Sequence, residues 1–204
     1  MGTDRWNQHI RTTLKRYDEA LTSYDKAQRI KPGYADAHWN ESLCRLLIGD
    51  FERGWEKYEW RWQSGSLCAM REFSKPLWLG KEDITGKTIL LHAEQGLGDT
   101  IQFCRYAPLV SALGAKVLME VPPPLKLLLA TLKGVSQIMA IGEPLPEFDY
   151  HCPLMSLPLV FKTDLESIPA DIPYLHPEKP AVSAWEERLS GFDGLRVGLV
   201  WAGS

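Results

Sequence analysis

The chain has 204 residues, of which 45% are hydrophobic and 24% are charged, and its formal net charge at pH 7 is −3. This composition is ordinary for a globular protein and leaves room for one large domain or two smaller ones. The weak negative charge excludes a broad electrostatic footprint for nucleic acid or an anionic membrane, so we expect no nucleic-acid partner.

The first part of the chain, residues 1–63, is expected to form a repeat region, because residues 10–62 match themselves at an offset of 34 residues. The matching positions carry residues of similar character: Ile10 with Cys44, Tyr17 with Phe51, Ala20 with Gly54, Leu21 with Trp55 and Tyr24 with Tyr58. A 34-residue period is typical of the tetratricopeptide repeat, and Leu14–Pro32 resembles its consensus closely. The resemblance implies about two helical hairpins, able to contact a protein partner.

Small and aromatic residues have distinct expected roles in these hairpins. We expect Ala20, Ala27 and Gly54 to let neighbouring helices approach closely, with Tyr24 and Tyr58 filling the space between helix pairs. Because two units bury too little core alone, a second surface should cover the aromatic end of the repeat region. The side chains expected to dock there, onto the following domain, are Trp55, Trp60 and Trp62. A partner-binding groove is the alternative.

Residues 64–86 are rich in Ser, Gly, Lys and Pro and predict a connector that Trp78 anchors. From residue 87 to 194, short apolar runs alternate with helical patterns, which predicts a Rossmann-like parallel sheet with helices on both faces. The predicted strands are Thr88–Ala93, Lys116–Val121, Val135–Ala140 and Phe148–Cys152, and the predicted helices are residues 99–113, 125–132, 154–160 and 181–189. The predicted fold class is therefore α + α/β.

A last strand is predicted at Arg196–Trp201, followed by a turn of small residues at Gly203 and Ser204. Such a strand and turn should lead into a further helix. We therefore expect residues 195–204 to begin a second, C-terminal domain, and the native chain to be longer than this sequence.

The first predicted strand leads into a glycine-rich corner that also carries an acid. Gly96 and Gly98 would allow a tight turn, and Asp99 is a suitable N-cap for the helix that follows. A strand, a glycine-rich turn and a helix N-terminus together form the usual ligand corner of an α/β sheet. The polar side chains able to hydrogen-bond a sugar there are Glu94, Gln95, Thr100 and Gln102.

Three interpretations of this corner compete. A dinucleotide site requires G-x-G-x-x-G, but Ile101 replaces the third glycine and Asp99 would repel a pyrophosphate, although Glu120 could mimic the ribose-binding acid. In the simplest interpretation, Asp99 only caps the helix. In the third, Asp99 is a general base that takes a proton from a substrate hydroxyl.

Three motifs occur in order along the chain: Gly96-Leu-Gly-Asp-Thr-Ile-Gln-Phe103, Phe148-Asp-Tyr-His-Cys-Pro-Leu-Met-Ser-Leu-Pro158 and Val197-Gly-Leu-Val-Trp-Ala-Gly-Ser204. Together they resemble glycosyltransferase family 9, the heptosyltransferase-like group with a GT-B fold, in the subgroup that tetratricopeptide repeats precede. The resemblance implies that residues 87–194 are the N-terminal, acceptor-side half of a GT-B enzyme.

The resemblance also implies a reaction. Asp99 matches the proposed catalytic base, which would deprotonate an acceptor hydroxyl as it attacks the anomeric carbon of a nucleotide sugar, with inversion and without a metal. Gly203 and Ser204 match the start of the donor half. The nucleotide sugar is then a co-substrate, no cofactor is bound, and the acceptor is a protein or a glycan. Since most donor-binding residues are not in this sequence, we expect the chain alone to be inactive.

The rival interpretation is a non-catalytic scaffold, in which the repeats bind a protein and the α/β domain is degenerate. His92 is expected to be a core histidine, and His151 and Cys152, adjacent on a strand, should point to opposite faces and form no catalytic couple.

The remaining expectations concern the compartment. No run of residues approaches the roughly 18 apolar residues of a membrane span, and the start of the chain lacks a signal peptide's apolar segment. The four cysteines form no CxxC pair, so no zinc site or disulfide framework is expected. The predicted location is the cytoplasm, with any membrane contact peripheral to the inner membrane.

Overall fold

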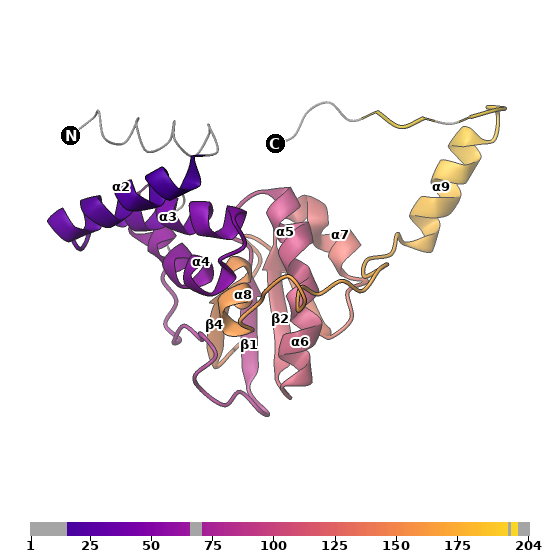
Figure 1. Cartoon of the computed structure of the whole chain (residues 1–204). Helices are drawn as coiled ribbons and strands as arrows, with labels where there is room; N and C mark the ends of the chain where they lie inside the picture. The colour runs from indigo at the N-terminus through magenta and orange to yellow at the C-terminus, as the bar shows by residue number, and fades with distance from the viewer. Residues whose placement is uncertain (1–15, 66–70, 196, 200–204) are drawn as a thin grey trace. The chain divides into compact units, whose positions relative to one another are not determined.

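The computed structural model describes residues 16–65, 71–195 and 197–199 (Figure 1). The chain divides into two compact units. The helical unit contains the described residues up to Ser74, together with Trp78–Glu82 and Ser156–Ile168. The sheet unit contains Lys75–Leu77, Asp83–Met155 and the described residues from Pro169 onward. The units are therefore interleaved along the sequence, whereas the sequence analysis expected consecutive domains with a connector at 64–86.

The helical unit is built from consecutive helices joined by short loops. They are α2 (Tyr17–Ile30), α3 (Ala35–Leu47), α4 (Phe51–Tyr58) and the 3₁₀ helix η1 (Glu59–Trp62), with the short helix α8 (Leu157–Val160) added from the later segment. α2 packs against α3, and α3 packs against α4. The helical character predicted for this region is confirmed within the described residues. The first helix of the first repeat unit lies outside them, and the tetratricopeptide assignment stays a prediction.

Close packing at the predicted small residues holds these helices together. Ala20, Tyr24 and Cys44 are buried together, and Tyr17 and Leu21 pack against them. Between α3 and α4, a methyl group added at Gly54 would lie only 2.7 Å from a side-chain carbon of Leu46. A larger residue at position 54 would therefore push the two helices apart, as the sequence indicates.

The aromatic residues of this unit contact groups within the unit itself. Trp55 Nε1 donates a hydrogen bond to the Thr163 carbonyl at 3.0 Å, and the Trp60 ring stacks on His38 with centroids 4.0 Å apart. Trp62 lies under the guanidinium of Arg61. These contacts do not show the expected docking of Trp55, Trp60 and Trp62 onto the following domain, because residues 156–168, which contain Thr163, belong to the helical unit.

The sheet unit contains four parallel strands in the order β3-β2-β1-β4. They are β1 (Thr88–His92), β2 (Lys116–Val121), β3 (Val135–Ala140) and β4 (Tyr150–Pro153). Each lies where an apolar run predicts it, to within about two residues at the ends. In β1 and β2 every residue but the first is buried, because strands in the middle of a covered parallel sheet contact neighbours on both faces.

The connection from β1 to β2 differs from the single predicted helix 99–113. It consists of α5 (Leu97–Phe103), η2 (Cys104–Tyr106) and α6 (Ala107–Ala112). The 3₁₀ segment η2 precedes Pro108, which has no N–H to bond the carbonyl of Cys104 and whose ring crowds that carbonyl. Gly114, with φ at +84°, ends the helix as expected.

The helices of the next connections are short. η3 (Pro123–Leu125) and α7 (Lys126–Leu129) join β2 to β3, whereas residues 141–149 join β3 to β4 without a helix. Since βαβ connections are right-handed, the helices of the β1–β2 and β2–β3 connections are expected on the same face of the sheet. In Figure 1, α5 and α6 lie across β2.

The end of the described chain holds no further strand. η4 (Leu154–Ser156) follows β4, and α9 (Lys179–Leu189) lies two residues from its predicted start and has no buried residue. Residues 197–199, the described part of the predicted last strand, adopt no strand conformation, and Gly203 and Ser204 lie outside the described residues. Within the described chain, no helix has the length and apolar character that crossing a membrane requires.

Candidate functional site

The strand order creates one topological switch point, between β1 and β4. The chain leaves β1 toward β2 and β3 on one side and returns to β4 on the other. In open α/β sheets, ligands bind beside the carboxyl ends of the two strands at such a point. Here those ends are His92 and Pro153, which are partners in the β1–β4 register. The predicted ligand corner, Ala93–Asp99, follows directly after β1.

Asp99 is not the N-cap of α5, so this part of the sequence prediction is wrong. The helix begins at Leu97 with Gly96 as N-cap, and Asp99 occupies its third position. The Gly96 amide donates a hydrogen bond to Asp99 Oδ2 at 3.1 Å. An acid three residues after the N-cap can reach back to the N-cap amide, which is the acidic half of a capping box. The contact holds the Asp99 side chain over the corner.

The two glycines of the corner do not serve a left-handed turn. Gly96 has φ −67° and ψ 172°, an extended conformation that other residues adopt, and Gly98 is not among the glycines with positive φ. A Cβ added at Gly98 would have no heavy atom within 4 Å. A left-handed turn is therefore not the reason for glycine at positions 96 and 98. Instead, Gly98 leaves open space above the backbone of the first turn of α5.

Glu94 lies at the switch point and connects its two sides. Its Oε1 accepts a hydrogen bond from the backbone amide of Met155 at 3.1 Å, and its side chain is half-buried. Met155 belongs to η4, directly after β4. The carboxylate of Glu94 thus joins the segment after β1 to the segment after β4. The amide of Met155 was not foreseen as part of this site, because no pattern marks a backbone donor.

The other predicted sugar-binding residues differ in accessibility. Gln95 is half-buried and Gln102 is exposed, so both can reach solvent near the corner. Thr100 is 2% exposed, and its hydroxyl donates to the Gly96 carbonyl at 3.1 Å. In this conformation the Thr100 hydroxyl supports the first turn of α5. Gln95 and Gln102 are thus the accessible amides near the corner, whereas Thr100 is turned inward.

A pair of histidines lies beneath the corner. His92 Nε2 and His151 Nδ1 are 3.2 Å apart, and the residues are 1% and 4% exposed. Glu120, 1% exposed, is the register partner of His92 on β2 and so lies on the same face of the sheet. His92 is a core histidine, as expected. Within the described chain, His, Cys, Asp and Glu residues form no group that could hold a metal ion.

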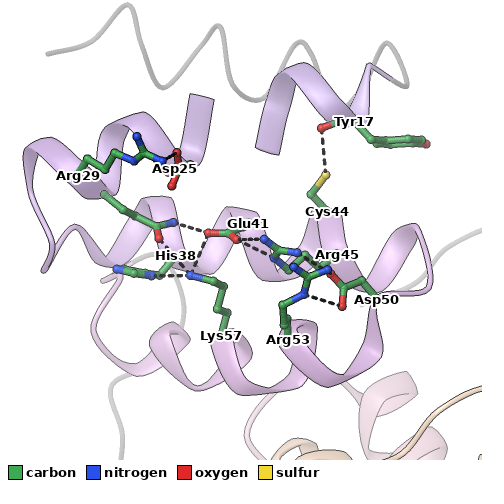
Figure 2. A network of polar contacts seen from close by, with 11 residues as sticks. Tyr17, Asp25, Arg29, His38, Glu41, Cys44, Arg45, Asp50, Arg53 and Lys57 are labelled. Carbon is green, nitrogen blue, oxygen red and sulfur yellow. Dashed lines mark hydrogen bonds and ion pairs between the residues drawn. The ribbon is translucent and has the colours of Figure 1, made fainter. Parts of the chain in front are cut away.

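The helical unit contains a second polar cluster, which the sequence analysis did not identify (Figure 2). Glu41, 4% exposed, forms ion pairs with Arg45 at 2.6 Å and Lys57 at 3.0 Å and accepts a hydrogen bond from Gln28. Burial alone raises the pKa of the Glu41 carboxyl, but the bonds from Gln28, Lys57 and Arg45 outweigh it and hold the pKa below its ordinary value. Glu41 therefore links α2, α3 and α4.

Within this cluster, the ammonium group of Lys57 has an acceptor for each of its donors. Its ammonium group also lies 3.1 Å from Gln28 Oε1 and 3.1 Å from His38 Nδ1. With Glu41 these make three acceptors for the three donors of an ammonium. Arg45 continues the cluster to Asp50, which also pairs with Arg53. The cluster stabilises the helices and presents no vacant charge to a ligand at Lys57.

No protein-family model matches this chain. It is similar to Protein FlbA of Caulobacter vibrioides (strain ATCC 19089 / CIP 103742 / CB 15), with 24% identity over 257 aligned residues. The alignment covers 96% of this chain and 43% of FlbA, so the chain spans less than half of the length of that relative.

Proposed function

We propose that the sheet unit is the acceptor-binding half of a metal-independent, inverting glycosyltransferase of GT-B type that uses a nucleotide-sugar donor. The sequence supports this through three ordered motifs that resemble glycosyltransferase family 9. The single structural observation that carries the proposal is the position of the corner Ala93–Asp99 at the β1–β4 switch point. The helices before it are proposed to be tetratricopeptide repeats that contact a protein.

The arrangement of the corner suits the proposed chemistry. Asp99 Oδ2 is held by the Gly96 amide, and Oδ1 takes part in none of the hydrogen bonds found among the described residues. Oδ1 can accept the proton of an acceptor hydroxyl while the carboxylate stays in place. At Gly98 an added Cβ would meet no atom within 4 Å, so the backbone of this turn is open to a ligand, and Gln95 and Gln102 could offer amides to the hydroxyls of a sugar. Gly203 and Ser204 are proposed to approach the donor phosphates.

A cytoplasmic location, with any membrane contact at the inner membrane, completes this proposal. Among the described residues, Cys44, Cys104 and Cys152 are buried and form no disulfide, which is consistent with a reducing compartment.

Acceptor binding can be tested on the chain as it stands. Amide signals of the ¹⁵N-labelled chain would be followed while an oligosaccharide released from lipopolysaccharide core is added. We expect shifts at Glu94, Gln95, Gly98 and Gln102, and at the Met155 amide. Shifts elsewhere only, with none in residues 94–102, would overturn the proposed acceptor site.

The base assignment needs sugar transfer by a protein that also carries the donor half. Asp99→Asn retains an oxygen that can accept the Gly96 amide but loses the basic carboxylate, so transfer should fall by about 10²–10⁴-fold. Asp83→Asn, at an exposed turn, is the matched control and should transfer normally. Full activity of Asp99→Asn would exclude Asp99 as the base.

A protein-binding scaffold is the second candidate, and one observation favours it. Leu43, Leu47 and Ile48 at the end of α3 are 41%, 62% and 42% exposed. Leu43 and Leu47 are four residues apart and so share one side of the helix. For a scaffold, Leu43→Ser with Leu47→Ser should abolish partner binding, and oligosaccharide should leave residues 94–102 unshifted.

A further inference from the structure

The buried histidines at the switch point form a pair whose geometry limits how many protons it can hold. His92 ends β1 and His151 lies in β4, so the contact of 3.2 Å between Nε2 and Nδ1 spans the two strands that flank the switch point. Their ring centroids are 5.4 Å apart. The next contact toward the carboxyl ends is the one between Glu94 and the Met155 amide. The two contacts together join the ends of β1 and β4.

A hydrogen bond between two imidazole nitrogens needs one N–H and one lone pair. A neutral pair meets this requirement, and so does a pair with one extra proton, because one ring can be an imidazolium while the other accepts. A second extra proton would place N–H against N–H and two positive charges side by side in a buried site. The closed contact therefore admits at most one added proton.

The surroundings support a single charge rather than two. On β2, Glu120 is the register partner of His92 and is buried on the same face of the sheet. On the other side of β4, Leu77 is bridged to His151, and Pro76 accepts the His151 amide. Lys75 of the same segment lies 3.9 Å from Glu147, and Glu94 bonds the Met155 amide. Of these groups, Glu120 is the one that the register of the sheet brings next to His92, where a carboxylate would favour one imidazolium.

We propose that the His92–His151 pair is an acid-sensitive latch that keeps the carboxyl ends of β1 and β4 together, and that uptake of a second proton opens it. In the open state both rings take up protons freely, so the open state binds one more proton than the closed state. The open-to-closed ratio therefore rises as pH falls below about 6.5, the ordinary value for histidine, and approaches tenfold per pH unit. The latch lies under the corner Ala93–Asp99, whatever ligand the corner takes.

Hydrogen exchange on the whole chain tests the latch directly. Protection factors, corrected for intrinsic exchange, would be compared between pH 7 and pH 5 for amides of the β1–β4 ladder and of the β2–β3 ladder. We expect protection in β4 and at Met155 to fall up to about tenfold per pH unit below pH 6. Protection between β2 and β3 should stay constant. Equal protection of β4 at both pH values would overturn the latch.

A substitution at His151 and the NMR signals of the histidine rings test whether the histidine pair itself causes the pH dependence. His151→Asn leaves one ring, so exchange in β4 should lose its pH dependence, whereas His176→Asn, at an exposed histidine of the same unit, should keep it. If His151→Asn does not fold, ¹⁵N signals of the histidine rings in the unmodified chain decide the question. One proton taken up by the pair before β4 opens supports the proposal. Two protons in the closed state, or none down to pH 5, contradict it.

Discussion

The helical unit and the sheet unit are stabilised in different ways. In the sheet unit, the central strands bury uninterrupted apolar runs, and Ile89, Leu90 and Leu91 are all fully buried. In the helical unit, α2 and α4 bury only two residues each, and a buried carboxylate holds three helices through ion pairs and hydrogen bonds. Apolar burial is non-directional, whereas these polar contacts require particular partners in particular positions. The helical unit should therefore be the more sensitive to loss of one charge.

The largest expected effect is in the sheet unit. Leu91→Ala removes a fully buried side chain from an inner strand and should lower the free energy of unfolding by about 3–4 kcal/mol, since the cavity cannot collapse completely. Hydrogen exchange should rise across residues 88–153. Leu127→Ala, at a side chain of the same unit that is 67% exposed, is the control and should change little. A loss below about 1 kcal/mol for Leu91→Ala would mean that burial does not dominate this unit.

The corresponding change in the helical unit removes a charge. Glu41→Ala leaves Lys57 and Arg45 without their shared carboxylate, and we expect a loss of about 2 kcal/mol, because both cations are largely buried. This loss can be measured by chemical denaturation, with hydrogen exchange in residues 17–62 as the signal. Glu56→Ala, exposed on α4, is the matched control. If Glu41→Ala and Glu56→Ala behave alike, the ion pairs contribute nothing and the contrast between the units fails.

The strands could be predicted from the sequence, but the polar cluster could not. Apolar runs such as those of β1 and β2 are local signals, and the sheet forms where they occur. The partners of Glu41 lie in three helices, with Gln28 before it and Lys57 after it, and nothing local distinguishes a buried glutamate from an exposed one. For the same reason, the sequence did not predict that residues 156–168 belong to the helical unit, since Trp55 and Thr163 are far apart in sequence.

The sequence indicated that a glycine-rich corner follows the first strand, but it did not give the local geometry of that corner. A strand followed by glycines and an acid marked the corner, and the strand order then placed it at the switch point. The role of Asp99 was misassigned because an acid can serve as N-cap or as the third helical residue, and the two differ only in where the helix begins. Thr100 turned inward because its hydroxyl reaches a carbonyl one turn back.

Acid should weaken the helical unit through its carboxylates. The pKa of Glu41 lies below its ordinary value of 4.5, and that of Asp50 lies below 3.8 because bonds to Arg53 and Arg45 outweigh the opposing effect of burial. The unfolded chain then binds more protons than the folded chain in this range, so stability rises with pH. The contribution of Glu41 should be complete above about pH 4.5 and should be lost as pH falls through its folded pKa.

Denaturation of the helical unit between pH 6 and pH 3 tests this dependence. Glu41→Gln keeps the size of the side chain but cannot ionise, so it should flatten the pH dependence while leaving the part due to Asp50. We expect the free energy of unfolding to fall less between pH 6 and pH 3 in Glu41→Gln than in the unmodified chain. If Glu41→Gln loses stability in acid as steeply as the unmodified chain, groups other than Glu41 cause the pH dependence of the helical unit.

The smallest expected effect separates stability from ligand binding at the corner. Gly98→Ala should raise stability by about 0.5–1 kcal/mol, because alanine favours a helix over glycine and the added Cβ meets no atom within 4 Å. If that space receives a ligand, the same methyl group should weaken binding of the oligosaccharide probe even though the fold improves. Gly191→Ala, where an added Cβ also meets nothing, is the control and should leave probe binding unchanged. A variant that is more stable but binds the oligosaccharide probe more weakly is explained only by a ligand in contact with the backbone of α5. If Gly98→Ala binds the probe as the unmodified chain does, Gly98 is not part of the binding site.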